Sequence, residues 1–124
     1  MDIKVYVHAT DIAGTDITLE QLDLLQDTGL LDEAKEVKVC THYDWKSFQD
    51  MKNEYHDLSY KHFNEDYKEW YEYTTCLEVQ EDCNKSDEDF LLLYIHNKGA
   101  FTRTVGNYNW RQYMQYFCIE KWKD

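Results

Sequence analysis

The sequence predicts an α/β fold, a Rossmann-like three-layer sandwich in which helices cover both faces of a mostly parallel sheet of about four strands. Segments with strand character alternate with segments of helical periodicity along the 124 residues. Parallel strands need crossover connections, and helices usually supply them. The chain has no proline and no Gly/Ser-rich linker. We therefore expect residues 1–124 to form a single domain.

Four segments are expected to form the strands. Residues 3–8 are β-branched and aromatic, residues 36–43 alternate apolar with polar positions, and a weaker strand is expected within residues 57–63. Residues 90–95 form a nearly continuous apolar run, which is typical of a central strand buried on both faces. The last segment is therefore the expected core strand.

A helix is expected from Thr18 to about Thr28. Thr18 and the glutamine three residues later can satisfy the first free amides of a helix. Gly29 follows at the position where a left-handed C-terminal cap favours a residue without a side chain.

Apolar residues at helical spacing predict three further helices. These cover residues 44–55, residues 66–82 and the stretch from about Asn109 to the end. In the last of these helices, we expect the side chains of Trp110 and Phe117 to lie in the core.

The charge of the chain limits its partners. It contains 25 acidic and 13 basic residues, which leave a formal charge of −12. Such a charge repels nucleic-acid backbones and anionic membrane surfaces, so no direct nucleic-acid partner is expected. The same charge suits a protein that presents an acidic surface to a basic partner. No signal-peptide pattern and no membrane-spanning apolar run is present, so we expect a cytoplasmic location, or the host cytoplasm for a viral protein.

No metal site is expected from the cysteines or from the acidic residues. The four cysteines have neither CxxC nor Cys/His zinc spacing, and we expect free thiols. The acidic turn at residues 87–89 has the composition of a cation site. It precedes the expected core strand, however, at the end opposite the expected ligand crevice.

A pattern in the C-terminal third resembles a known protein family. The segment LLYIHNKG at residues 92–99 is followed, after a polar loop, by NWRQYMQYF at residues 109–117 and IEKW at residues 119–122. This pattern resembles a glycosyltransferase-like family of bacteria, viruses and some eukaryotes. In that family, an apolar strand ends in Tyr-x-His-Thr-Lys-Gly, and a later helix opens with Trp-Arg. Asn97 stands here where the family has threonine.

The resemblance implies the N-terminal half of a nucleotide-sugar transferase fold. In that family, the first half holds the nucleotide, and a later half supplies metal and acceptor contacts. The family continues into a Gly-Asn-Phe-Trp-Trp-like segment, which this sequence lacks. The resemblance therefore implies a domain that is truncated relative to the family and is not catalytic alone, with unassigned catalytic residues. Its implied ligand is a nucleotide-sugar, with a divalent cation such as Mn²⁺ or Mg²⁺.

Several polar residues are expected to meet where the strands end, because open parallel sheets bind ligands beyond their carboxyl ends. Lys98 would pair with a diphosphate, and His96 would donate a hydrogen bond to a phosphate oxygen. Arg111 would either contact the ligand or hold the preceding loop. The predicted ligand-binding residues are His8, Thr10, Asp11, Asp44, His96, Asn97, Lys98 and Arg111.

Two functions remain open from the sequence. The first is a glycosyltransferase-like domain with a partial or vestigial nucleotide-sugar crevice. The second is a small acidic module, of viral type, that binds or inhibits a protein through an acidic or aromatic surface. A histidine at a strand end also commonly serves only as a structural hydrogen-bonding residue.

Overall fold

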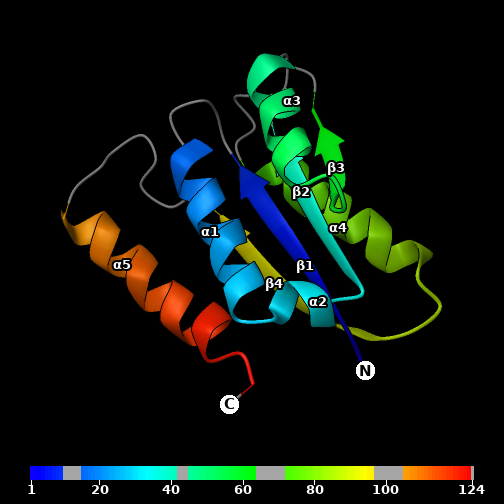
Figure 1. The fold of residues 1–124 in the computed structure, drawn as a ribbon. Coiled ribbons are helices and arrows are strands. Elements are labelled where there is room, and N and C mark those ends of the chain that lie inside the picture. The colour runs from blue at the N-terminus through cyan, green and yellow to red at the C-terminus, as the bar shows by residue number, and fades with distance from the viewer. Residues whose placement is uncertain (10–14, 42–44, 64–71, 97–104, 124) are drawn as a thin grey trace.

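The computed structural model describes residues 1–9, 15–41, 45–63, 72–96 and 105–123. Its four strands form one parallel sheet in the order β3-β2-β1-β4 (Figure 1). The strands are β1 (Asp2–Ala9), β2 (Glu36–Thr41), β3 (Ser59–His62) and β4 (Phe90–His96). The predicted α/β class, with a parallel sheet of four strands, is confirmed.

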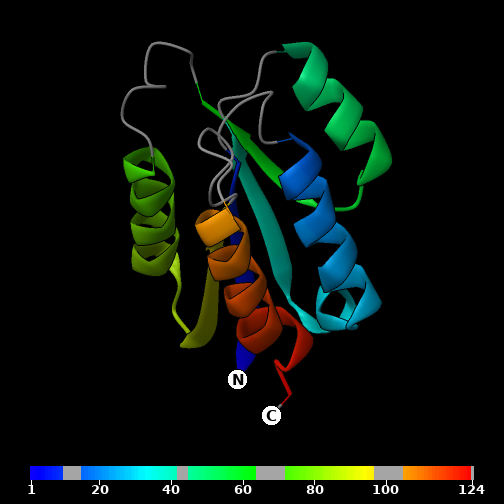
Figure 2. The ribbon, with the colours of Figure 1, turned by 90° about the vertical axis from the view of Figure 1, so that its left-hand side faces the viewer.

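Helices cover both faces of this sheet. They are α1 (Thr15–Asp27), α2 (Leu30–Glu33), α3 (Trp45–Glu54), α4 (Tyr73–Lys85) and α5 (Val105–Gln115), which continues into the π-helical turn η3 (Tyr116–Glu120). Figure 2 shows α4 on one face of the sheet and α1 and α3 on the other. The end of α5 and η3 pack beside α1, where Trp122 Nε1 donates to the carbonyl of Thr28 at 3.1 Å. Among the residues that the structure describes, no helix combines the length and the apolar character that crossing a bilayer requires.

The strand that was expected in the centre of the sheet lies at its edge. β1 pairs with both β2 and β4, so β1 is the central strand, whereas β4 pairs with β1 alone among the described strands. Leu91 and Leu92 of β4 are 56% and 42% exposed. The prediction for residues 90–95 was wrong because an apolar run reports the lack of polar residues, not the position of a strand in the sheet.

The hydrophobic core lies between the sheet and α1, α3 and η3. Val5, Val7 and Ala9 alternate along β1 and point to this side, where they are fully buried. Leu22 and Leu25 lie opposite them on α1. The remaining buried members of the cluster are Leu30, Val37, Val39, Met51, Ile95 and Ile119.

The opposite face of the sheet carries polar residues beneath α4. Tyr6 and Lys38 are register partners on β1 and β2, and both bond to the carboxylate of Asp82 on α4. Along β1 and β2, apolar side chains that face α1 therefore alternate with side chains such as Tyr6 and Lys38 that face α4. This polar face positions the histidines discussed below.

The helix after β1 begins earlier than expected. It begins at Thr15, so Thr18 lies inside the helix, where it is fully buried, and the predicted N-cap at Thr18 was wrong. The end of the helix is as predicted, because Gly29 has the left-handed φ of 81°. A Cβ added to Gly29 would meet nothing within 4 Å, so the requirement for glycine comes from the backbone conformation and not from crowding.

The side chains of Trp110 and Phe117 do not lie in the core. They are 51% and 55% exposed, although both stand on the predicted helix. The helical spacing of aromatic residues was correct, but α5 buries Arg111 and Gln115, and η3 buries Ile119, instead. A helix with apolar residues on several sides does not show from its sequence which side faces the protein.

Candidate ligand-binding site

The strand order reverses between β1 and β4. The chain steps outward from β1 through β2 to β3 and then returns to place β4 on the other side of β1. Open parallel sheets bind ligands outside the carboxyl ends of the strands at such a reversal. His8 and His96 stand there as register partners on the two adjacent strands. The sequence thus predicted correctly that these two histidines lie near each other.

His8 is buried beneath α4. Only 1% of the residue is exposed, and its Nδ1 lies 2.7 Å from Oγ1 of Thr75 on α4. The tautomer decides which of these two atoms donates the hydrogen bond. The contact joins β1 to α4, so in this structure the His8 ring helps to hold the helix against the end of the strand. Its role as a ligand contact stays a prediction.

Cys40 lies beside His8 as its register partner on β2. Burial raises the pKa of the Cys40 thiol to about 12, and the nearby carboxylate of Glu78 acts in the same direction. A thiol with so high a pKa remains protonated at neutral pH and is a poor nucleophile. This Cys/His neighbourhood, which the sequence analysis missed, could have been found by aligning the ends of the two strands.

His96 reaches the surface at the end of β4. Its side chain is 35% exposed, and its ring stacks on Tyr94 with centroids 6.0 Å apart. Its Nδ1 lies 3.6 Å from the carboxylate of Glu72, which also accepts a hydrogen bond from the Tyr94 hydroxyl. Burial, and then this bond to Glu72, raise the pKa of Tyr94. Of the two histidines, His96 is therefore the one that a ligand in solution can approach.

Five of the predicted binding residues lie outside the described part of the chain. These are Thr10, Asp11, Asp44, Asn97 and Lys98. They follow directly or closely after the described ends of β1, β2 and β4. Their place in the sequence therefore keeps them candidates for the crevice.

Arg111 lies between α5 and α1. The residue is 9% exposed, and its Nε lies 3.6 Å from a carboxylate oxygen of Glu20. The guanidinium also lies 5.4 Å from the centre of the Tyr108 ring, within reach of a cation–π interaction. Arg111 thus holds two helices together, and its predicted contact with a ligand stays a prediction.

A small cavity of about 60 Å³ lies between β4, α1 and α5. Its lining includes Gln21, whose Nε2 donates to the carbonyl of His96 at 2.7 Å, and Gln115, which is 3% exposed. Among the described residues, Gln21 Oε1 and both amide atoms of Gln115 have no hydrogen-bond partner. Buried amides normally have partners, and the volume suits about two water molecules. In the sequence, the signal for this cavity is a glutamine, such as Gln21 or Gln115, at a position of a helix that the apolar pattern assigns to the buried side.

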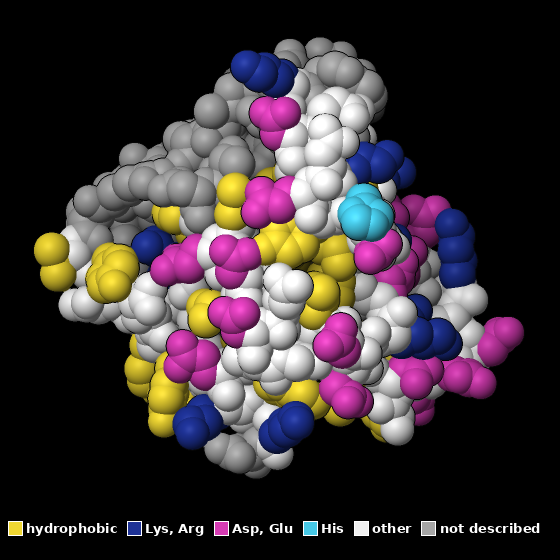
Figure 3. Space-filling view, viewed as in Figure 1, with side chains coloured by type: hydrophobic (Ala, Val, Ile, Leu, Met, Phe, Trp, Pro, Cys, Tyr) yellow, Lys and Arg dark blue, Asp and Glu magenta, His cyan; other side chains and the backbone are white. Residues whose placement is uncertain are grey.

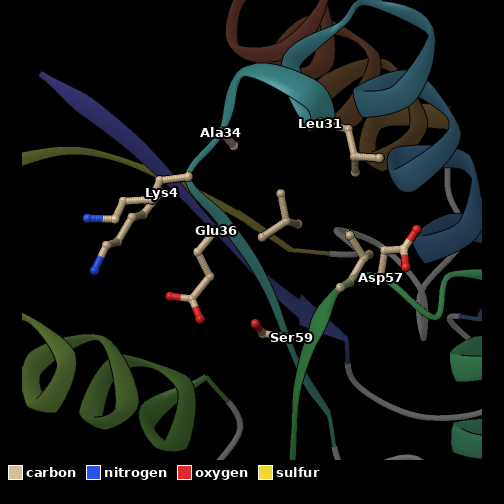
Figure 4. Close-up of a pocket in the computed structure, with 9 residues that line it drawn as sticks. Lys4, Leu31, Ala34, Glu36, Asp57 and Ser59 are labelled. Atoms are coloured by element: carbon tan, nitrogen blue, oxygen red, sulfur yellow. The ribbon is translucent and has the colours of Figure 1, made fainter.

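A wider depression lies at the opposite edge of the sheet (Figure 4). It has a volume of about 410 Å³ and is open to solvent. Lys4, Glu36, Asp57 and Ser59 line it together with the apolar side chain of Leu31. These residues lie near the amino ends of β2 and β3, away from the strand reversal, and their charges are mixed.

The described residues include no group of three or more His, Cys, Asp or Glu side chains arranged to hold a metal ion. The acidic residues Asp87, Glu88 and Asp89 are exposed in the connection between α4 and β4. That connection is at the amino end of β4, as the sequence indicated. Asp11 and Asp44 are the acidic residues that follow the carboxyl ends of β1 and β2.

Comparison with known proteins places the chain in a family. The profile of a family described as a domain of unknown function, DUF8361, matches residues 3–121. No curated protein and no solved structure matches the chain significantly. Because the match covers nearly the whole sequence, this chain belongs to the DUF8361 family.

Proposed function

We propose that this chain is a glycosyltransferase-like domain with a partial or vestigial nucleotide-sugar-binding crevice, and that it does not catalyse transfer alone. One observation carries the proposal. The strand order reverses between β1 and β4, and the His-Asn-Lys-Gly segment begins where β4 ends at that reversal. Nucleotides bind at this place in open parallel sheets.

The chemistry of the segment suits a diphosphate. Lys98 supplies a compact positive charge, and Gly99 lets the backbone approach the phosphate oxygens. The His96 side chain is about one-third exposed, and Tyr94 and Glu72 fix the orientation of its ring. An oriented imidazole can donate to a phosphate oxygen with less loss of conformational freedom than an unrestrained one.

A divalent cation such as Mn²⁺ or Mg²⁺ is part of the proposal. When bound, it would neutralise charge on the diphosphate. The described residues offer no cluster for it, so Asp11 and Asp44 are the carboxylates proposed to hold it. Hard cations of this kind prefer oxygen ligands, which these side chains provide.

A titration of the purified chain tests the proposal. Calorimetry and thermal shift are measured with UDP, GDP and their sugars, each with and without Mn²⁺. A ligand at a hundred times its Kd stabilises the folded state by roughly 2.7 kcal/mol. Lys98→Ala and His96→Ala should each weaken binding at least tenfold.

The matched control is Lys85→Ala, which removes an exposed lysine that forms an ion pair with Glu81 on the same helix. It should leave nucleotide affinity unchanged. Absence of any response at millimolar ligand would reject the crevice. Equal losses in the Lys98 and Lys85 variants would show only a nonspecific effect of net charge.

One observation favours a second function, that of an acidic module for a basic protein partner. Figure 3 shows Asp and Glu side chains spread over the face that contains α1, α2 and α3. The exposed acidic residues of these elements and the turn that follows α3 are Glu20, Asp23, Asp27, Asp32, Glu33, Asp50, Glu54 and Asp57. A surface of one sign attracts partners of the other sign and speeds their association.

Binding of a Lys/Arg-rich peptide separates the two functions. The acidic module predicts affinity that falls steeply with salt and that weakens in the double variant Asp23→Asn, Asp27→Asn. The double variant Asp87→Asn, Asp89→Asn changes the net charge equally at a distant turn and is the control. Lys98→Ala should leave peptide binding intact. Equal losses in the two double variants would reject a dedicated acidic surface.

A further inference from the structure

The outward face of α5 and η3 is apolar. Trp110 stacks on Tyr113 at 5.9 Å between centroids, and Phe117 continues the row 4.8 Å from Tyr113. The large hydrophobic residues of this face are between 42% and 76% exposed, and they are Val105, Tyr108, Trp110, Tyr113, Met114, Tyr116 and Phe117. Trp110 and Met114 also line the small cavity beside β4, whereas the printed ring contacts of Tyr113 and Phe117 are with other rings of α5 and η3.

The area of this face matches an interface. Large side chains of this kind present about 150–250 Å² each, so seven that are about half-exposed leave roughly 700 Å². The largest apolar patch of a typical monomer covers about 300–600 Å². Each partner in a stable complex buries about 800 Å². The face is therefore larger than a monomer normally leaves in water and close to what one side of a complex needs.

The outer edge of β4 adjoins this helix. Figure 2 shows α5 lying across the side of the sheet that β4 occupies. No described strand pairs with the outer edge of β4, and Leu91 and Leu92 are exposed there. Residues 90–95 contain no charge and no proline, two devices that protect an edge from pairing with another chain. A third device, a covering helix, is present only beside the carboxyl-terminal half of β4, where Tyr94, Ile95 and His96 share a small cavity with α5.

Neither β4 nor α5 contributes an acidic residue of its own, although Glu72 lies beside His96 and Glu20 lies beside Arg111. The chain has 25 Asp and Glu residues, and none lies between Phe90 and Ile119. We call the surface of β4 and of residues 105–119 the acid-free face. Two copies that each carry a net charge of −12 repel each other, and this face adds no carboxylate of its own, while Glu20 and Glu72 at its border are each beside a basic or imidazole side chain.

We propose that two copies of this chain form a twofold-symmetric dimer through the acid-free face. A twofold interface brings the same surface of both copies together, so a surface free of acid is self-compatible. The amino-terminal parts of the two β4 edges, at residues 90–92, meet antiparallel, and the two α5 helices pack their aromatic rows against each other. The inference does not depend on the proposed nucleotide crevice.

Sedimentation velocity and light scattering over a range of protein concentrations test the dimer. The expected mass doubles from 15.1 kDa, with no larger species, because a twofold interface is closed. Raising the NaCl concentration should tighten the dimer, because salt screens the repulsion between the two acidic bodies. A monomer at all accessible concentrations, or an open-ended series of oligomers, overturns the proposal.

Two variants locate the interface. Phe117→Glu in the aromatic row and Leu92→Lys on β4 should each weaken the dimer at least tenfold. Tyr73→Glu is the control, because Tyr73 is 58% exposed on α4 at the opposite face of the sheet. Circular dichroism and thermal melting verify that each variant is folded. If Phe117→Glu or Leu92→Lys does not fold, Tyr113→Glu is tested in its place. An equal effect of Tyr73→Glu would contradict the assigned surface. A chain that stays monomeric while binding a foreign polypeptide here would also overturn the dimer.

Discussion

The Nζ atom of Lys38 lies 2.5 Å from Oδ2 of Asp82, which joins the second strand to α4 across the polar face of the sheet. The same nitrogen lies 3.1 Å from Glu78, and the Tyr6 hydroxyl donates to Asp82 at 3.0 Å. The side chains of Lys38, Glu78 and Asp82 are each less than one-fifth exposed. Perturbed charges often mark functional sites, but this cluster lies away from the strand ends and serves to hold α4.

Replacing Lys38 with methionine should destabilise the protein by on the order of 3 kcal/mol, because two largely buried carboxylates would lose their cation. Urea denaturation measures the change in the free energy of unfolding. Lys85→Met is the matched control, since the exposed pair of Lys85 with Glu81 should contribute no more than about 0.5 kcal/mol. A loss below about 1 kcal/mol for Lys38→Met would show that the cluster is not an essential link.

The same cluster predicts how stability depends on pH at the acid end. Burial acts to raise the pKa of Asp82, but the bonds from Lys38 and Tyr6 outweigh it and lower the pKa below its ordinary value. A carboxyl with a lowered pKa in the folded state stabilises the protein above its unfolded pKa of about 3.9. That stability is lost as the pH falls below about 4 through the folded pKa. Melting temperatures between pH 2 and 7 should show this loss, and Lys38→Met should make it smaller.

At the alkaline end, the sign is opposite. Burial acts to lower the pKa of Lys38, but Asp82 and Glu78 raise it above its ordinary value. Burial and the Asp82 carboxylate likewise raise the pKa of Tyr6. Both groups therefore contribute stability below about pH 10, which is lost as the pH rises further. A melting temperature that stays constant from pH 9 to 12 would contradict this assignment.

Gln115 offers a test of the small cavity beside β4. Its amide is buried and has no hydrogen-bond partner in the part of the chain that the structure describes, an arrangement that normally costs about 1–3 kcal/mol. Gln115→Leu should therefore raise the free energy of unfolding by about 1 kcal/mol. Gln112→Leu, one turn away and only partly buried, is the control and should change little. A clear loss of stability in Gln115→Leu would mean that the amide has partners, such as bound water.

The helices and strands could be predicted from the sequence, but the way in which they pack beside one another could not. The strand over residues 3–8, predicted from its β-branched and aromatic residues, and the glycine cap at Gly29 depend on local chemistry, and both predictions were confirmed. The edge position of β4 depends on the strand order, which no local pattern encodes. The pairing of Arg111 with Glu20 likewise joins two helices far apart in the sequence. The sequence alone could not show whether Arg111 contacts a ligand or another helix, because Glu20 lies far from it along the chain.

Thiol labelling should separate the cysteines by their surroundings. Cys76 and Cys83 are exposed on α4, whereas Cys40 is fully buried beside His8 on the neighbouring strand, with its pKa raised to about 12 by burial. Reaction requires the thiolate and access to it, so Cys76 and Cys83 should react with a disulfide reagent at neutral pH. Cys40 should react only as fast as the protein unfolds. The single variant Cys40→Ala identifies its phase. Labelling of Cys40 at the rate of Cys76 in the native protein would show that α4 lifts from the sheet and opens the strand ends, where the His8 ring would then become available to a ligand.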